Sequence, residues 1–482
     1  MNMKIRHTSL LLVSGLLSLQ LLSSCSKVKD ERNDITDPAL QMTVLDLVNA
    51  NPQLSTFKEY LVKTGYDKVI SSSRNYTVFA PVNSALSSLD PAIVNDAVKL
   101  KSFIGNHIAL QQYRTSEIVQ PTRIGMLNDK YNNMQGKKIE DATITTADKY
   151  AGNGLLQVID KALPALDNCW EFLNNSSNAP VKQKTFMLSL FRKVFDPTNA
   201  VVTSINPVTG EPIYQAGTDS VFTNLFWNRV HDLKVEKKQF TLFMLTDAAW
   251  DAEITKYMPY FVTNTADSNT LVTSWNVVKD FAVDTVYQPN SIPDTVVSKF
   301  GTKLPVNKSA IVRTIKTSNG IVYVMSQMNV LPASKFKTIT IQAESYIAQS
   351  VNRRSNTYFR DRFNPLTGLD FTDVNVFNHG VSNFWLRYEV PEVPSIKYKA
   401  YWVALNDFQT AAYTQRLGWG TGAVLPALSA VVNPNVYSEV YVGEIPLTFY
   451  SPVLNVYLVG ANSTTAAVNP LSCDYIKLVP SL

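Results

Sequence analysis

One short stretch occurs twice in the chain, and it restricts the fold more than any other feature. Residues 76–86 read YTVFAPVNSAL, and residues 240–250 read FTLFMLTDAAW. Each stretch begins as an apolar strand, reaches Asn83 or Asp247, and continues with small and apolar residues. Because Asn and Asp are favoured helix N-caps, both stretches predict a strand, a tight turn and a helix capped by that residue.

Two further pairs of segments follow in the same order. KSF at 101–103 is matched by KDF at 279–281, and NGLL at 153–156 is matched by NGIV at 319–322. Three paired segments in one order indicate two copies of one domain. Apolar residues at helical spacing before the first stretch, and short strand patterns after it, predict an α+β domain with helices on a small sheet.

The first copy resembles a fasciclin domain. That family has a TVFAPxNxA segment, which is Thr77 to Ala85 here, followed by an FxxxHI segment at 103–108 and an NG…VID strand at 153–160. The resemblance implies a binding or adhesion role. It also places His107 in an apolar helix, where we expect a buried core residue.

The second copy departs from this pattern at Met244 and Leu245. Its spacing nevertheless predicts a second fasciclin-like domain at 181–334, after a first domain at 41–165 and a turn-rich linker at 166–180. An insertion at 197–219 predicts a projecting turn or hairpin.

The pattern changes after residue 334, where alternating runs replace helical spacing. Many short strands in 335–482 predict an antiparallel β-sandwich. Its ends, IQAESY at 341–346 and DYIKLVP at 474–480, resemble a jelly roll of the galactose-binding, carbohydrate-binding-module type, as does NFWLRYEV at 383–390. The predicted fold class is therefore multidomain, with two α+β fasciclin-like domains followed by an all-β jelly-roll sandwich.

The first residues predict export. Lys4 and Arg6 precede an apolar run at 10–22 that is too short to span a bilayer, and small residues precede Cys25. Cys25 resembles the lipid-modified cysteine of bacterial lipoproteins, so 1–24 is the expected signal peptide and 25–40 a lipid-anchored tether. The alternative is a cleaved signal with an incidental cysteine.

Lys29, Asp30 and Glu31 resemble the surface-export signal of some Gram-negative lipoproteins, with an ordinary polar tether as the alternative. We expect the protein at the bacterial outer membrane, lipid-anchored and surface-exposed. The formal charge is +5, and two of those charges lie in the signal, so the remaining chain gives no sign of a nucleic-acid partner.

No residue pattern predicts catalysis. After the signal, the histidines are His107, His231 and His379, one in each predicted domain, which disfavours a histidine-based metal cluster or general base. Cys169 and Cys473 lie in different predicted domains; a disulfide between them has no support in the sequence. We therefore expect a protein that is not an enzyme and requires no cofactor.

The third domain contains the ligand-binding candidates. Sugars stack on aromatic faces and need amides nearby. Trp419 lies in a predicted Gly-Trp-Gly loop, Tyr358 in a polar loop, and Asn462 in the last loop before the final strand. The alternative is that these aromatics pack on the sandwich or on the second domain. Trp385 and Trp402 lie in strand patterns and are expected in the core.

A structural calcium ion is a further expectation for this domain. Gln342 and Glu344 are two residues apart on a predicted strand and so face the same side. In similar modules a Gln and a Glu at these places, with an Asp near the last strand, hold Ca²⁺. Asp474 matches that Asp, and oxygen ligands suit the ion.

The favoured function is non-enzymatic adhesion or glycan binding at the cell surface. A polysaccharide-uptake system is one setting in which such a protein would act. A second reading is an accessory subunit of an outer-membrane complex, which would show a broad apolar patch. The weakest is a glycan hydrolase, which would need two carboxylates across a cleft.

Overall fold

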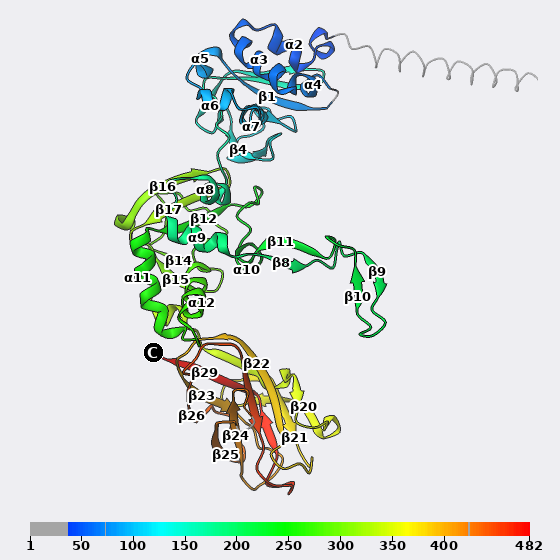
Figure 1. The fold of residues 1–482 in the computed structure, drawn as a ribbon, viewed down its shortest axis with the longest axis vertical. Helices are drawn as coiled ribbons and strands as arrows, with labels where there is room; N and C mark the ends of the chain where they lie inside the picture. Colours follow the sequence, from blue (N-terminus) through cyan, green and yellow to red (C-terminus); the bar gives the residue numbers. More distant parts are fainter. Residues whose placement is uncertain (1–36, 73, 423–424) are drawn as a thin grey trace, which may run out of the picture. The chain divides into compact units, whose positions relative to one another are not determined.

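The computed structural model describes residues 37–482 except residues 73 and 423–424. The predicted signal peptide, Cys25 and most of the predicted tether lie outside the described residues. The chain divides into two compact units (Figure 1). Unit 1 contains the residues up to Trp170 together with Lys234–Lys238 and Lys316–Asn319, and unit 2 contains the rest. No helix among the described residues is long and apolar enough to cross a membrane.

Unit 1 is built on a seven-stranded sheet in the order β2-β1-β7-β6-β5-β4-β3. Strand β1, second from one edge, alternates between two cores, because Val78 and Ala80 pack under the helices while Phe79 packs on the other side. The elements are α2 (Val44–Asn49), α3 (Ser55–Thr64), α4 (Tyr66–Ile70), β1 (Tyr76–Pro81), α5 (Asn83–Leu86), α6 (Pro91–Val94), α7 (Ala97–Gly105), β2 (Ile108–Ala109), β3 (Thr122–Gly125), β4 (Tyr131–Gln135), β5 (Lys138–Ile139), β6 (Ala142–Ala151) and β7 (Gly154–Ile159).

The first part of unit 2 contains a four-stranded sheet in the order β13-β12-β17-β16. The elements from residue 169 to residue 335 are α8 (Cys169–Asn175), α9 (Val181–Ser189), β8 (Phe191–Phe195), β9 (Val202–Ile205), β10 (Pro212–Tyr214), β11 (Ser220–Asn224), α10 (Leu225–Arg229), β12 (Phe240–Leu245), α11 (Asp247–Tyr257), α12 (Ala266–Val278), β13 (Ala282–Val283), β14 (Thr295–Val297), β15 (Lys303–Pro305), β16 (Ile311–Thr317), β17 (Gly320–Met325) and α13 (Pro332–Lys335).

The two repeated stretches form strands with the same register. β1 pairs in parallel with β7 from Tyr76 opposite Gly154, and β12 pairs in parallel with β17 from Phe240 opposite Gly320. Only glycine fits at the first position of β7 and of β17. A Cβ on Gly154, for example, would lie 2.1 Å from the Tyr76 carbonyl oxygen. The repeated Asn-Gly therefore marks a close backbone approach in both sheets.

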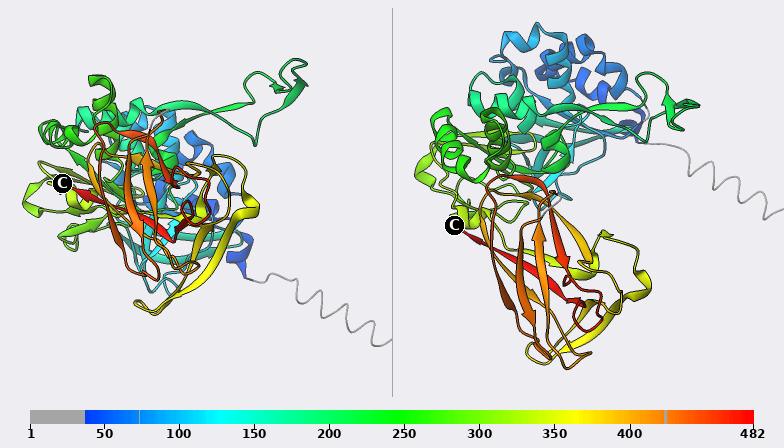
Figure 2. Two further views of the ribbon diagram at one scale, coloured as in Figure 1. Left: turned by 90° about the horizontal axis from the view of Figure 1, so that it is seen from below. Right: turned by 60° about the horizontal axis from the view of Figure 1, so that its bottom comes forward.

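The predicted insertion is an ordered arm. β8 pairs with β11, and β9 pairs with β10 beyond them, so that residues 191–224 form two consecutive two-stranded ribbons (Figures 1 and 2). The projecting hairpin predicted from the turn residues is thereby confirmed.

The C-terminal part of unit 2 consists of three antiparallel sheets, in the orders β18-β29-β23-β26, β19-β22-β27-β24-β25 and β20-β21-β28. Its core includes Tyr388, Tyr398, Trp402, Val456 and Ile476. The strands are β18 (Ile339–Gln342), β19 (Ala348–Gln349), β20 (Thr357–Asn364), β21 (Leu369–Val376), β22 (Trp385–Val393), β23 (Lys397–Val403), β24 (Tyr413–Trp419), β25 (Ala427–Val432), β26 (Val440–Pro446), β27 (Ser451–Val459), β28 (Leu471–Cys473) and β29 (Tyr475–Ser481).

Candidate functional site: one end of the β-sandwich

The outer face of the five-stranded sheet places an aromatic residue beside polar loops. In β22, Leu386, Tyr388 and Val390 are buried, so the alternate residues face outward. Trp385 is one of these and is partly exposed. The expectation that Trp385 is a core residue is wrong, because it shares its face with charged side chains of the same strand. Trp402, with no exposed surface, is in the core as expected.

A row of three outward residues crosses the sheet at this end. Trp385 pairs with Val459 of β27, and Val459 pairs with Arg416 of β24. Neighbouring strands lie about 4.8 Å apart, so the indole and the guanidinium group share one face with only Val459 between them. The ring of Tyr457 meets Trp385 edge-on, with centroids 5.3 Å apart. That contact helps to fix the indole plane.

Arg416 continues the row into a polar cluster formed by two loops. Arg416 Nη2 donates to Asn383 Oδ1 and to the Gly460 carbonyl oxygen, each at 2.6 Å. Asn383 Nδ2 in turn donates to Asn462 Oδ1 at 2.9 Å, and Ser382 Oγ donates to the same oxygen. Asn462 is exposed, and its own Nδ2 donates to no group among the described residues. The cluster thus holds a free amide donor in a fixed position.

A cavity of about 430 Å³ lies at the same end of the sandwich, lined by residues 406–410, Pro434 and Asn435. Gln409 Nε2 donates to the Ala467 carbonyl oxygen at 3.0 Å, which ties the cavity wall to the loop that carries Asn462. Asp407 faces this cavity and accepts a hydrogen bond from Arg360 Nη1 at 2.6 Å. Arg360 also pairs with the fully buried Asp373.

The structure does not bring the three predicted ligand-binding residues together. Trp419 is the last residue of β24 and pairs with buried Val456, so its side chain lies on the inner side of the sheet and is only partly exposed. The prediction of a glycine loop is wrong here, because Gly418 continues the strand. Tyr358 lies in strand β20, not in a loop, and is 50% exposed. Only Asn462 lies in the polar cluster.

Two of the three predicted calcium ligands, Glu344 and Asp474, lie close enough for their charges to interact. Strand β18 ends at Gln342, and Glu344 lies in a 3-10 helix, so the argument that strand alternation aligns them is wrong. Gln342 is exposed. Glu344 has one buried carboxylate oxygen, Oε2, without a hydrogen-bond partner. Burial, and then the charge of Glu344, raise the pKa of Asp474 to about 6. Two carboxylates that repel each other, one with an unpaired oxygen, suit a hard cation.

Among the described residues, no group of three or more His, Cys, Asp and Glu side chains is arranged to hold a metal ion. Any cation at Glu344 and Asp474 would therefore need further oxygen ligands. Cys169 and Cys473 are both buried and free, so the disulfide that the sequence left open is not formed. His107 is fully buried, as expected.

Comparison with known proteins identifies one part of the chain. Residues 52–165 match the Fasciclin domain. The chain is also similar to Protein sll1483 of Synechocystis sp., with 27% identity over 138 residues that make up 27% of this chain and 75% of the relative. The fasciclin domain lies within unit 1 and contains the first of the two repeated stretches.

The comparison with solved structures gives matches of low TM-score, among them the following three. The FAS1 domain pair of the insect cell adhesion molecule Fasciclin I is 16% identical, with a TM-score of 0.24, and the match covers 59% of this chain and 99% of that structure. A family 35 carbohydrate binding module of Clostridium thermocellum is 16% identical, with a TM-score of 0.22, over 30% and 100%. A β-1,3-glucan-binding CBM6 of Bacillus halodurans is 15% identical, with a TM-score of 0.21, over 30% and 96%.

Sequence reasoning missed Trp385, Arg416 and Asn383 as site residues. The alternation in β22 contained a usable signal, because Trp385 stands two and four residues before charged Arg387 and Glu389. Arg416 and Asn383 gave no comparable signal, since only the pairing of β24 with β27 and the folding of two loops bring them to Trp385.

Proposed function

We propose that the chain is a non-enzymatic binding protein of the bacterial cell surface, and that its β-sandwich binds glycan at the row formed by Trp385, Val459 and Arg416. The observation that supports this most directly is the partly exposed indole of Trp385, in line with a guanidinium group and a fixed cluster of amides. Proteins bind sugars by combining an aromatic face with a few placed polar groups.

In this proposal a pyranose ring stacks on the indole of Trp385. Arg416, whose Nη2 is held by Asn383, donates to sugar hydroxyls through its remaining N–H groups. The amide of Asn462 donates a second hydrogen bond. Because these donors are already held in place, a ligand would lose little affinity in ordering them.

The test is a glycan array followed by calorimetry with the best ligand. We expect Trp385→Ala to weaken binding at least tenfold, which corresponds to about 1.4 kcal/mol. Tyr441→Ala is the matched control, because Tyr441 is also an exposed strand aromatic (52%) but lies in β26 of the other sheet. Trp419→Ala is measured in parallel. If it weakens binding while Trp385→Ala does not, the binding site is not at the row.

The proposal includes lipid anchoring and a second fasciclin-like domain. The sequence around Cys25 supports the anchor, and the shared register of β1/β7 and β12/β17 supports the second domain at 181–334. Cys25→Ala should release the protein from the membrane fraction, since the acyl chains that hold it would be absent. Retention of this variant after a high-salt wash would count against the anchor.

Calcium is also part of the proposal. Glu344 and Asp474 would hold the ion, with Gln342 beside them at the end of β18. The bound charge would neutralise two carboxylates that now repel each other.

One observation favours the second candidate function, an accessory subunit of a membrane complex. The arm at 191–224 exposes apolar side chains on both ribbons, including Phe195, Val202, Ile205, Val208 and Phe222. Isolated two-stranded ribbons are marginally stable, so a partner protein would stabilise the arm. Replacing residues 197–219 with a short Gly-Ser linker should abolish co-purification of a partner from membranes under this candidate and leave glycan binding unchanged.

A further inference from the structure

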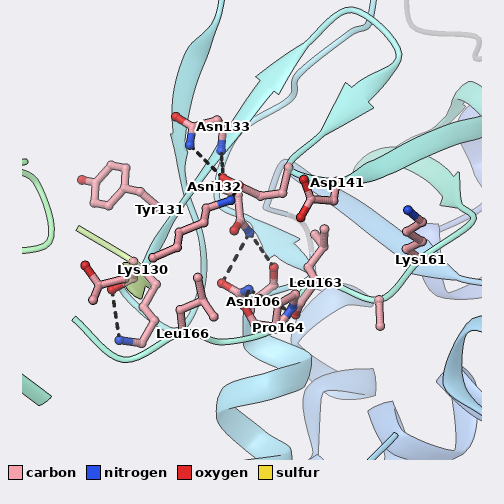
Figure 3. A pocket seen from close by; sticks show the side chains of 15 residues that line it. Asn106, Lys130, Tyr131, Asn132, Asn133, Asp141, Lys161, Leu163, Pro164 and Leu166 are labelled. Carbon is pink, nitrogen blue, oxygen red and sulfur yellow. Dashed lines mark hydrogen bonds and ion pairs between the residues drawn. The ribbon is translucent and has the colours of Figure 1, made fainter. Parts of the chain in front are cut away.

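Unit 1 contains a pocket of about 380 Å³ that is separate from the β-sandwich (Figure 3). All its lining residues belong to unit 1. The volume lies in the range that encloses a small ligand. The segment after β7 provides an apolar surface, with Leu163 almost fully buried and Leu166 partly exposed.

The side-chain amides of two buried residues, Asn106 and Asn132, form another wall of the pocket (Figure 3). Asn106 Nδ2 donates to the Pro164 carbonyl oxygen at 3.0 Å, and Asn132 Nδ2 donates to the Asn106 carbonyl oxygen at 3.1 Å. Asn132 is only 5% exposed, yet its Oδ1 accepts no hydrogen bond from any described residue. Because Asn132 lines the pocket, this oxygen is an acceptor that a ligand can use.

Some of the charged side chains that line the pocket form ion pairs, and others do not. Lys130 Nζ pairs with Glu236 Oε1 at 3.0 Å, and Lys316 Nζ pairs with Glu140 Oε2 at 2.6 Å. Lys161 and Asp141 also line the pocket, but neither makes an ion pair or a side-chain hydrogen bond with any described residue. Asp141 directly precedes β6, and Lys161 follows the end of β7, the strand that pairs with β6, so the two residues lie on neighbouring segments of the chain.

We propose that this pocket binds an acidic sugar, a hexuronic acid residue. Such a residue presents a carboxylate to Lys161, hydroxyl donors to Asp141 and to Asn132 Oδ1, and a C–H face to the partly exposed Leu166. A neutral hexose leaves the lysine without an anion, and a simple fatty acid leaves both acceptors unfilled. The pocket would thus give the chain a second carbohydrate site that selects for charge and is independent of Trp385.

The test compares sodium galacturonate with galactose, which differ only at C6, in NMR titrations of the full chain at low salt. We expect galacturonate to bind at least tenfold more tightly than galactose. Lys161→Gln should remove that preference, and Asp141→Ala should weaken both sugars. Lys138→Gln is the matched control, because Lys138 is an exposed lysine of β5 outside the pocket, and it should change nothing.

Equal affinity for the two sugars, no binding of either, or unchanged galacturonate binding in Lys161→Gln would each overturn the proposal. Trp385→Ala separates this site from the sandwich. If that variant loses galacturonate binding, the sugar binds on the sandwich and the pocket proposal fails. If it keeps galacturonate binding but loses array glycans, both sites are supported.

Discussion

Asn83 Oδ1 accepts the backbone N–H of Thr56 at 3.0 Å, so this side chain caps a helix other than its own. Thr56 is the second residue of α3. In the second repeat, Asp247 Oδ1 accepts the backbone N–H of Lys182 at 2.9 Å, and Lys182 is the second residue of α9. The matched residues therefore perform the same task, but not the predicted one. The N-caps of α5 and α11 are Val82 and Thr246.

Replacing either residue with alanine should destabilise its own repeat by about 0.5–2 kcal/mol, as losses of helix caps do. Hydrogen exchange should show lost protection at the start of α3 for Asn83→Ala and at the start of α9 for Asp247→Ala. Ser84→Ala, at the exposed neighbouring position, serves as the control. Lost protection confined to α5 or α11 would contradict the assignment across helices.

This pair shows what sequence could and could not predict. The repeat, the strands and the importance of both residues followed from local patterns. The helix that each side chain caps did not follow, because the partner amides are 27 and 65 residues away. Only the tertiary fold decides which unpaired N–H group lies within reach.

In the candidate site, too, local sequence patterns predicted some features, and the tertiary fold decided the rest. Strand alternation could assign Trp385 to the outer face, whereas the Gly-Trp-Gly pattern at Trp419 was misleading. Glycine is common in loops, but Gly418 continues β24 opposite Tyr457, and the strand ends only at Gly420, where φ is +98°. Asn462 was found because loop position and residue type agreed. Its partners Asn383 and Ser382 lie 79 and 80 residues away.

Gly154→Ala and Gly320→Ala should each cost more than about 3 kcal/mol of stability, which is a large effect for one methyl group. A Cβ on Gly320 would lie 2.0 Å from the Phe240 carbonyl oxygen, and backbone atoms in a paired strand cannot move aside easily. Thermal unfolding measures the effect. Gly136→Ala is the control: it has open space around it and a φ of +52°, so about 1 kcal/mol is expected. Equal effects at all three sites would show that the close approach does not matter.

His107 should make the fasciclin domain less stable in acid. Its Nδ1 donates to the Phe103 carbonyl oxygen at 2.8 Å, and its Nε2 accepts the Leu163 N–H at 2.9 Å. Burial lowers the pKa of His107 to about 4. The unfolded chain therefore takes up a proton first as the pH falls below about 6.5. Stability should fall from there to pH 4 by about 3 kcal/mol in total.

The measurements are urea unfolding between pH 7 and pH 4 and an NMR titration of the imidazole groups. His107 should stay neutral until close to pH 4. A midpoint near 6.5 for this residue, or stability that does not change over this range, would contradict the account.

Asp474 gives the opposite pH dependence, and calcium should remove it. Because burial and Glu344 raise the pKa of Asp474 to about 6, the folded sandwich holds this proton more tightly than the unfolded chain does. Without calcium, this group should therefore add stability as the pH falls through 6 towards its ordinary pKa of 3.8, by up to about 3 kcal/mol in total. Calcium at pH 7 should raise the melting temperature of the sandwich, since a ligand that binds only the folded state stabilises it.

Glu344→Gln and Asp474→Asn should each raise the calcium-free melting temperature and abolish the calcium increment, because one repelling charge and one ligand are lost together. Asp370→Asn, at an exposed position, should change neither quantity. If both carboxylate variants keep the full calcium increment, the ion binds elsewhere.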